Sequence, residues 1–111
     1  MKFALKRAKK FGWQGLKGWA YSSKKDFKRA SAAYFEINGS HGKIKTIRSD
    51  RIYFVIQGKG KFIIKNKIFS VKSKDVIIVP KNVPYDYSGK MKLFLVHTPS
   101  FDAAFERQLK K

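Results

Sequence analysis

The sequence predicts an all-β protein: an antiparallel β-barrel with a basic N-terminal arm and a short C-terminal helix. From Ser31 onward, short runs of β-branched and aromatic residues alternate with turn residues at regular intervals, which is typical of a sandwich or barrel. The chain has 111 residues, enough for one hydrophobic core and too few for two. We therefore expect residues 31–111 to form one domain, and residues 1–30 to be an arm that does not fold independently.

The arm is expected to be mostly irregular. It carries ten lysines and arginines against a single acid, Asp26. Residues 2–10 suit a short basic helix. Residues 11–21 place three glycines among large aromatic side chains, which favours an extended segment over a regular element. We expect Trp13 and Trp19 to pin this segment on the barrel or on a neighbouring subunit.

The barrel strands are expected where apolar runs lie between turn residues. The predicted strands span residues 32–37, 43–48, 51–57, 61–65, 68–72, 75–79 and 91–97. Asn66 suits the tight turn of a hairpin, because asparagine tolerates a positive φ. Residues 75–79 are nearly all branched aliphatic, as in a strand covered on both faces. Residues 101–111 are expected to be helical, with Asp102 as the N-cap.

Composition limits the classes of partner and site. The chain has no cysteine, which excludes disulfides and thiolate sites. Its net charge of +19 attracts polyanions, but the lysines recur singly along nearly every segment, which favours a solvated face over a binding patch. Nucleic-acid binding through the arm is an alternative, with Trp13 or Trp19 stacking on bases. No apolar run suits a signal peptide or a membrane span, so we expect a cytoplasmic protein.

Residues 51–99 resemble the more conserved half of a small single-domain cupin. An aromatic-aliphatic strand runs into a glycine pair, a hairpin follows, an acid opens a branched strand, and a proline-rich turn comes next. The residues that carry this series are Gly58, Gly60, Asp75, Pro80, Asn82 and Pro84. The resemblance implies a jelly-roll barrel.

Cupins usually hold a metal ion on three histidines and a glutamate, and the resemblance places other residues there. The glutamate corresponds to Arg51, and the histidine of the second motif corresponds to Tyr85. The first two histidines fall on Ile44 and Thr46, or on Lys45 and Ile47. A fixed cation at Arg51 would repel a divalent ion, so we expect no metal, no cofactor and no redox chemistry.

Metal-ligand positions in cupins point into the barrel, so the resemblance, extended along each strand by alternation, implies which side chains face the interior. The five candidate ligand-binding residues are Arg51, Tyr53, Tyr85, Tyr87 and His97. A guanidinium pairs with carboxylate or phosphate, and phenol rings stack on flat faces, which suits a small polar or anionic, sugar-like or carboxylate-like ligand. Simpler roles compete: Tyr53 and Tyr87 as core, Arg51 exposed beside Asp50, and His97 buried and neutral. His41, in a glycine-flanked turn, is expected to be solvated.

An enzymatic alternative comes from metal-free cupins. The sugar-nucleotide epimerases and isomerases of that group use a histidine as base and a tyrosine as acid, which makes His97 and Tyr85 the candidate catalytic pair, with Tyr53 as a second acid. No acidic residue near His97 in the sequence backs it, so non-catalytic ligand binding is favoured. We expect a homodimer.

Overall fold

The structure is a computed structural model that describes residues 1–109, and its regular elements are β-strands apart from two short turns of helix. The strands are β1 (Lys9–Trp13), β2 (Leu16–Ala20), β3 (Ser31–Ser40), β4 (Ile44–Thr46), β5 (Asp50–Ile64), β6 (Lys67–Lys72), β7 (Val76–Val79), β8 (Tyr85–Thr98) and β9 (Glu106–Gln108). Two short 3₁₀ turns, η1 (Leu5–Arg7) and η2 (Ala103–Phe105), complete the elements. The prediction of an all-β antiparallel fold is confirmed. Among residues 1–109 no helix is long and apolar enough to span a membrane.

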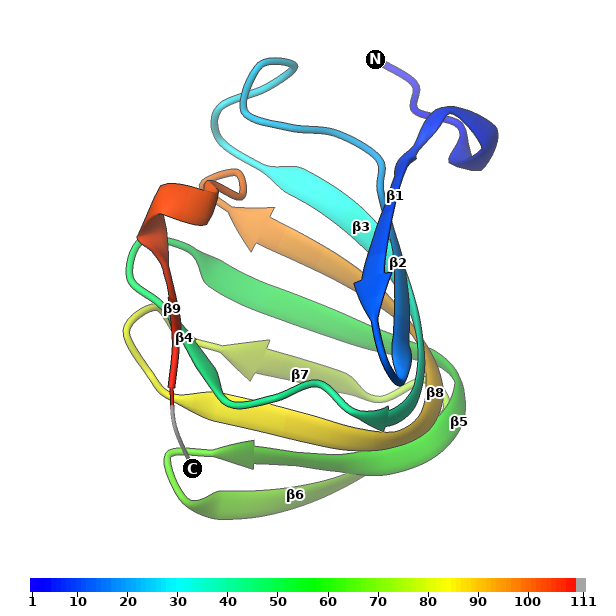
Figure 1. Ribbon diagram of the computed structural model, residues 1–111, viewed down its shortest axis with the longest axis vertical. Coiled ribbons are helices and arrows are strands. Elements are labelled where there is room, and N and C mark those ends of the chain that lie inside the picture. Colours follow the sequence, from blue (N-terminus) through cyan, green and yellow to red (C-terminus); the bar gives the residue numbers. More distant parts are fainter. Residues whose placement is uncertain (110–111) are drawn as a thin grey trace.

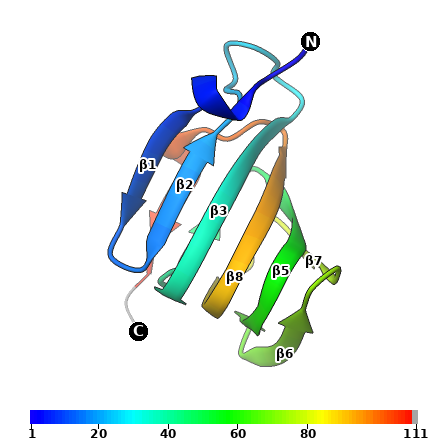
Figure 2. The same ribbon diagram turned by 90° about the vertical axis from the view of Figure 1, so that its right-hand side faces the viewer.

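The strands form one curled antiparallel half-barrel built on β5 and β8. These two strands pair along their whole length, from Asp50 opposite Thr98 to Ile64 opposite Tyr85. β3 pairs with the other edge of β8 and carries β2 and then β1, while β7 and β6 follow one another along the far edge of β5. Figure 1 shows the curl from its side, with β4 and β9 across its opening, and Figure 2 shows β1, β2, β3, β8 and β5 side by side.

The curl depends on glycines at the bend of the two long strands. Gly60 and Gly89 lie directly opposite each other, and a Cβ on Gly89 would lie 2.6 Å from the Cα of Gly60. Gly58, at φ +97°, follows a bulge in β5 between Val55 and Gln57. The turn predicted over residues 58–60 is therefore a bend inside one strand, because the ladder with β8 continues through it. For the same reason β8 begins at Tyr85 and not at the predicted residue 91.

The interior is filled by alternate residues of the strands, as a period of two requires. The buried apolar set is Leu16, Ala33, Phe35, Ile37, Tyr53, Val55, Phe62, Val71, Val79, Tyr85, Tyr87, Met91, Leu93 and Leu95. The hairpin turn between β5 and β6 is confirmed, with Asn66 at φ +67°. Three of the core residues are tyrosines, so the interior is not purely apolar.

The arm differs from its prediction. Residues 9–20 form a regular hairpin, β1–β2, whose second strand pairs with β3 from Leu16 opposite Ile37 to Ala20 opposite Ala33. The glycines fit this hairpin: the ring of Phe11 lies over Gly18, where a Cβ would come within 2.3 Å of it. The helix expected over residues 2–10 is reduced to the single turn η1. Trp13 is 51% exposed, so it does not anchor the hairpin by burial.

The predictions for the C-terminal segment and for residues 75–79 are also corrected. Asp102 accepts a hydrogen bond from the amide of Ala104 as predicted, but the helix lasts one turn and gives way to β9, which pairs with β4. Residues 110 and 111 of the predicted helix lie outside the described residues. β7 is covered on its inner face alone, because Val76 and Ile78 are 56% and 60% exposed.

Candidate functional site

The predicted inward-facing residues all lie inside the half-barrel. Arg51 and Tyr53 come from β5, and Tyr85, Tyr87 and His97 come from β8. Each is at most 5% exposed, so Arg51 does not lie exposed beside Asp50. The strand alternation that predicted their direction is confirmed. Whether they bind a ligand stays a prediction.

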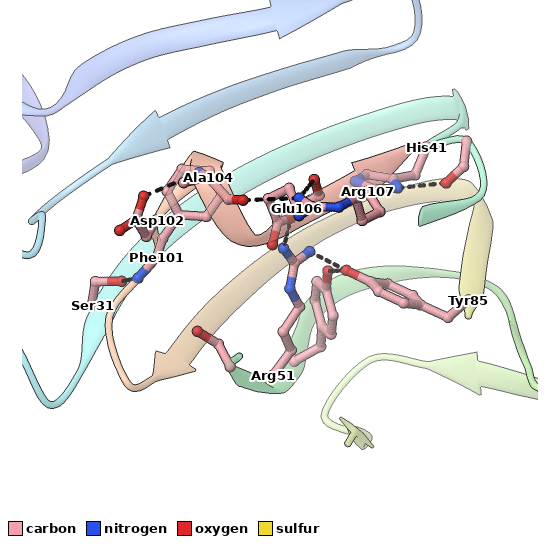
Figure 3. Close-up of polar contacts among 12 residues, drawn as sticks. Ser31, His41, Arg51, Tyr85, Phe101, Asp102, Ala104, Glu106 and Arg107 are labelled. Atoms are coloured by element: carbon pink, nitrogen blue, oxygen red, sulfur yellow. Dashed lines mark hydrogen bonds and ion pairs between the residues drawn. The ribbon is translucent and has the colours of Figure 1, made fainter. Parts of the chain in front are cut away.

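Arg51 is bonded on both sides within this interior (Figure 3). One terminal nitrogen of its guanidinium donates to the hydroxyl of Tyr85, and the other forms an ion pair with Glu106 of β9. The Tyr85 hydroxyl in turn lies 2.8 Å from the Tyr53 hydroxyl. These contacts form a continuous hydrogen-bonded network of side chains from β9 to the centre of the core.

Burial and neighbouring groups fix the protonation states of Arg51, Tyr85 and Tyr87. Burial opposes the charge of Arg51, but Tyr85, Tyr53 and Glu106 hold its pKa above its usual range, so the guanidinium stays charged. Burial raises the pKa of Tyr85 well above that of a free phenol, and it does the same for Tyr87. Both phenols are therefore neutral hydrogen-bond donors at physiological pH.

His41 joins this site, although it was expected to be solvated. It is 8% exposed, and its ring stacks on that of Tyr87 with 4.5 Å between centroids. Its amide donates to the Tyr87 carbonyl at 2.8 Å, and the next amide, of Gly42, donates to a carboxylate oxygen of Asp86 at 2.9 Å. These bonds fold the turn after β3 back over the interior. The signal was available in the sequence, since the alternation of Ala33, Phe35 and Ile37 continues to His41.

The hydrogen bonding of His41 determines which ring nitrogen can accept a proton. Nδ1 lies 2.9 Å from the Gly42 carbonyl, which can only accept, so Nδ1 carries the proton. Nε2 is then the unprotonated ring nitrogen and carries a lone pair that can accept a proton. Burial lowers the pKa of His41 to about 4, so the ring is neutral at pH 7.

His97 lies beside Arg51 across the β5–β8 pairing. Burial, and then the charge of Arg51, lowers its pKa well below its usual range. No hydrogen bond joins it to any tyrosine of the described chain, and its ring meets Phe101 edge-on at 5.3 Å. The structure therefore brings His97 and Tyr85 onto one strand face but does not couple them directly.

Several polar atoms of this interior have no partner among the described residues. They are Thr46 Oγ1, Arg51 Nε, Tyr87 Oη, His97 Nε2 and Glu106 Oε2. Buried polar atoms are almost always hydrogen-bonded, and an exception calls for an explanation such as a water or a ligand. The set contains both donors and acceptors, which is the pattern that a hydroxyl-rich molecule matches.

The positions at which the resemblance to cupins places metal ligands carry other side chains. Arg51 occupies the position expected for a ligating glutamate, and its charged side chain points at Tyr85, which stands for the second-motif histidine. Ile44, one of the positions expected for a first-motif histidine, packs against the core. In the part of the chain that the structure describes, no group of three or more His, Cys, Asp or Glu residues lies close enough to hold an ion.

Comparison with solved structures establishes the fold class. No family model matches the chain, and a search of curated proteins finds no match. A variant of Streptomyces PAC13 with uridine is similar, with a TM-score of 0.91 and 23% identity over 98% of this chain and 90% of that chain. PAC13 is a nucleoside dehydratase. The chain has a cupin-like fold.

Two other cupin-like structures agree with this assignment. Bacillus subtilis oxalate decarboxylase matches with a TM-score of 0.86 and 14% identity over 96% of this chain and 32% of that chain. KdgF from Halomonas sp. matches with a TM-score of 0.78 and 13% identity over 92% and 96%. At these identities the likeness extends to the fold. The resemblance found in residues 51–99 is thus supported for architecture.

Proposed function

We propose that this protein binds a nucleoside in its half-barrel without a metal ion, and that His41 and Tyr87 move protons on the bound molecule. The observation that carries the proposal is the stacked His41–Tyr87 pair, which combines an unprotonated imidazole nitrogen with an unpartnered phenol hydroxyl in one buried site. The polar or anionic, sugar-like or carboxylate-like ligand that the sequence predicts is thereby narrowed to a molecule with a flat base and a polyhydroxyl sugar.

The comparison with PAC13 supports this class of ligand. That protein is seen with uridine in a variant that replaces a histidine by glutamine, and in two variants that each replace a tyrosine by phenylalanine. This chain also combines a histidine with tyrosines in its interior: His41 lies within 6.0 Å of Tyr85 and 4.5 Å of Tyr87, measured between ring centroids. A planar base is suited to stacking on such rings.

The site is equipped for elimination of water from a sugar. A neutral imidazole can take a proton from a carbon next to a carbonyl, at Nε2 of His41. The C–O bond at the neighbouring carbon then breaks, its oxygen takes the phenol proton of Tyr87, water leaves and a C=C bond remains. The proton on His41 returns to the phenolate through solvent, so no oxidant is consumed.

Arg51 would assist this chemistry by placing a fixed positive charge beside the bound molecule. Its cation lies 5.5 Å from the centroid of the Tyr85 ring and is fixed by Glu106. It can stabilise negative charge that develops on a substrate oxygen, as a buried guanidinium commonly does. The alternative pair His97 and Tyr85 has less support, because Tyr85 is already engaged by Arg51 and Tyr53.

Binding requires an entrance, since the site residues are at most 8% exposed. β9 brings Glu106 to the site and pairs with β4 over three residues, from Ile44 opposite Gln108 to Thr46 opposite Glu106. We infer that β9 moves when a ligand enters, and that the Arg51–Glu106 ion pair restores the closed arrangement.

Uridine titration followed by isothermal calorimetry and proton NMR tests the proposal. We expect saturable binding by the wild type and loss of most affinity in His41→Gln and Tyr87→Phe. Tyr34→Phe is the matched control, because Tyr34 lies on the outer face of β3 and bonds Glu36. Chelator should leave binding unchanged.

The proton-transfer step needs its own readout. Incubation with nucleosides that carry a carbonyl in the sugar, in deuterated water, should give solvent exchange or elimination that His41→Gln abolishes. Binding without any exchange would reduce the proposal to a nucleoside-binding protein. Failure of every nucleoside to bind, with a folded protein, would contradict it altogether.

A further inference from the structure

The outer face of the sheet carries an uncharged apolar strip across five strands, from β7 through β5, β8 and β3 to β2. Cross-strand pairing aligns two rows: Ile78, Ile52, Val96 and Ala32 in one, and Val76, Phe54, Phe94, Tyr34 and Trp19 in the other. None of these nine residues is charged. Figure 2 faces β2, β3, β8 and β5, the central strands of this strip.

The side chains of the strip are exposed most strongly on β7 and β5. Val76 and Ile78 are more than half exposed, and Ile52 and Phe54 are each 37% exposed. Together with Ile56, these side chains present apolar area on the order of 400 Å², which is already within the range of the largest patch on a typical monomer. The partly exposed aromatic end, Phe94, Tyr34 and Trp19, extends the strip toward the area of about 800 Å² per partner of a standard interface.

Polar residues frame the strip on both sides. The next row of the sheet contains Lys17, Glu36 and Lys92, and the opposite border contains Asp50 paired with Thr98. An apolar centre with a polar rim is the usual anatomy of a protein interface. The strand sequence of β7 agrees, because its four residues Val76, Ile77, Ile78 and Val79 include no polar side chain for an outer, solvated face.

We propose that a second copy of this chain packs its own strip against this one, giving a face-to-face homodimer related by a two-fold axis. The charge distribution favours contact between two copies of the chain at this strip. A chain with a net charge of +19 repels its copy wherever lysines meet, and the strip is where both copies lack them. Most soluble oligomers are homo-oligomers, and a two-fold contact uses the same patch on both subunits. Two sheets packed face to face bury such rows as a shared core.

Sedimentation velocity and light scattering of the wild-type protein over a wide concentration range test this directly. We expect a species of twice the chain's 12.8 kDa mass. Ile78→Lys should shift it to the monomer, because lysine on the edge strand β7 brings two cations into the shared core. Ile68→Lys is the matched control: Ile68 is 64% exposed on β6, outside the strip, and should leave the dimer intact.

Circular dichroism of each variant shows whether it is folded. If Ile78→Lys fails to fold, hydrogen exchange of the wild type on dilution replaces it, with protection expected to fall on β5 and β7 as the dimer dissociates. A wild type that stays monomeric at every concentration would overturn the proposal. So would a dimer that survives Ile78→Lys, or one that Ile68→Lys disrupts, since either places the contact elsewhere.

Discussion

The guanidinium of Arg51 donates to the hydroxyl of Tyr85 across two neighbouring strands, and both side chains are almost fully buried. The second terminal nitrogen of Arg51 meets Glu106, which lies 55 residues further along the chain. One buried cation thus ties the core of the half-barrel to the strand that covers it. We therefore expect the stability of the fold to depend on the Arg51–Glu106 ion pair.

Replacement of Arg51 by methionine tests that dependence. The variant leaves the Glu106 carboxylate facing the interior without its cation, and we expect a loss on the order of 3 kcal/mol of unfolding free energy. Urea denaturation measures it. Arg51→Met combined with Glu106→Leu removes both charges and should lose less than Arg51→Met alone.

Arg48→Met is the control for loss of an arginine as such. Arg48 is 4.0 Å from Asp102 and its side chain is 43% exposed, so its removal should cost less than about 1 kcal/mol. Equal losses at the two arginines would contradict a structural role specific to Arg51.

Tyr85→Phe and Tyr87→Phe compare the contribution to stability of a hydrogen-bonded phenol hydroxyl with that of a buried hydroxyl that has no partner among the described residues. The Tyr85 hydroxyl serves Arg51 and Tyr53, so its removal should destabilise the fold by about 1–3 kcal/mol. The Tyr87 hydroxyl is buried without a partner, so its removal should be neutral or stabilising. Thermal denaturation of the two variants checks this. A larger loss at Tyr87 would mean that its hydroxyl is satisfied in solution.

The parts of this site that sequence could predict are those set by strand alternation. The resemblance to cupins, extended by period-two alternation, predicted five inward-facing residues, and all five are buried: Arg51, Tyr53, Tyr85, Tyr87 and His97. His41 was missed because a glycine-flanked turn suggested solvent, although the alternation of β3 extends to it. Glu106 was missed because its partner is remote in sequence, and local helix signals around Asp102 outweighed a strand pairing that only the fold reveals.

Elemental analysis tests the loss of metal ligands. We expect the purified protein to contain less than stoichiometric Fe, Mn, Ni and Zn, and its melting temperature to be unchanged by chelator, because the resemblance to cupins places Arg51 and Tyr85 where ion ligands would stand. A tightly bound ion, or a chelator-induced fall in melting temperature, would show that a ligand set exists outside the positions considered.

Gly89→Ala tests the bend of the half-barrel. An added Cβ would lie 2.6 Å from both the Cα of Gly60 and the carbonyl oxygen of Lys59, and backbone cannot yield as a flexible side chain does. We expect destabilisation of about 3 kcal/mol or more. Gly42→Ala is the control, because Gly42 also has a positive φ but nothing lies within 4 Å of its Cβ position, so only backbone strain of about 1 kcal/mol remains. Urea denaturation of both variants measures the difference, and equal losses would mean that the close approach of β5 and β8 is not what matters.

His41 makes the stability of the fold dependent on pH. Its pKa falls from 6.5 in the unfolded chain to about 4 in the fold, mainly through burial. The unfolded chain therefore binds the proton first as pH falls, so stability is complete above about pH 6.5 and is lost between there and about pH 4. The shift corresponds to about 3 kcal/mol, and His97 acts in the same direction. Urea denaturation at a series of pH values should show this decline, and His41→Gln should flatten part of it. If the wild type and His41→Gln decline in parallel, His41 is not buried as a neutral ring, and its role as the base of the proposed site fails with it.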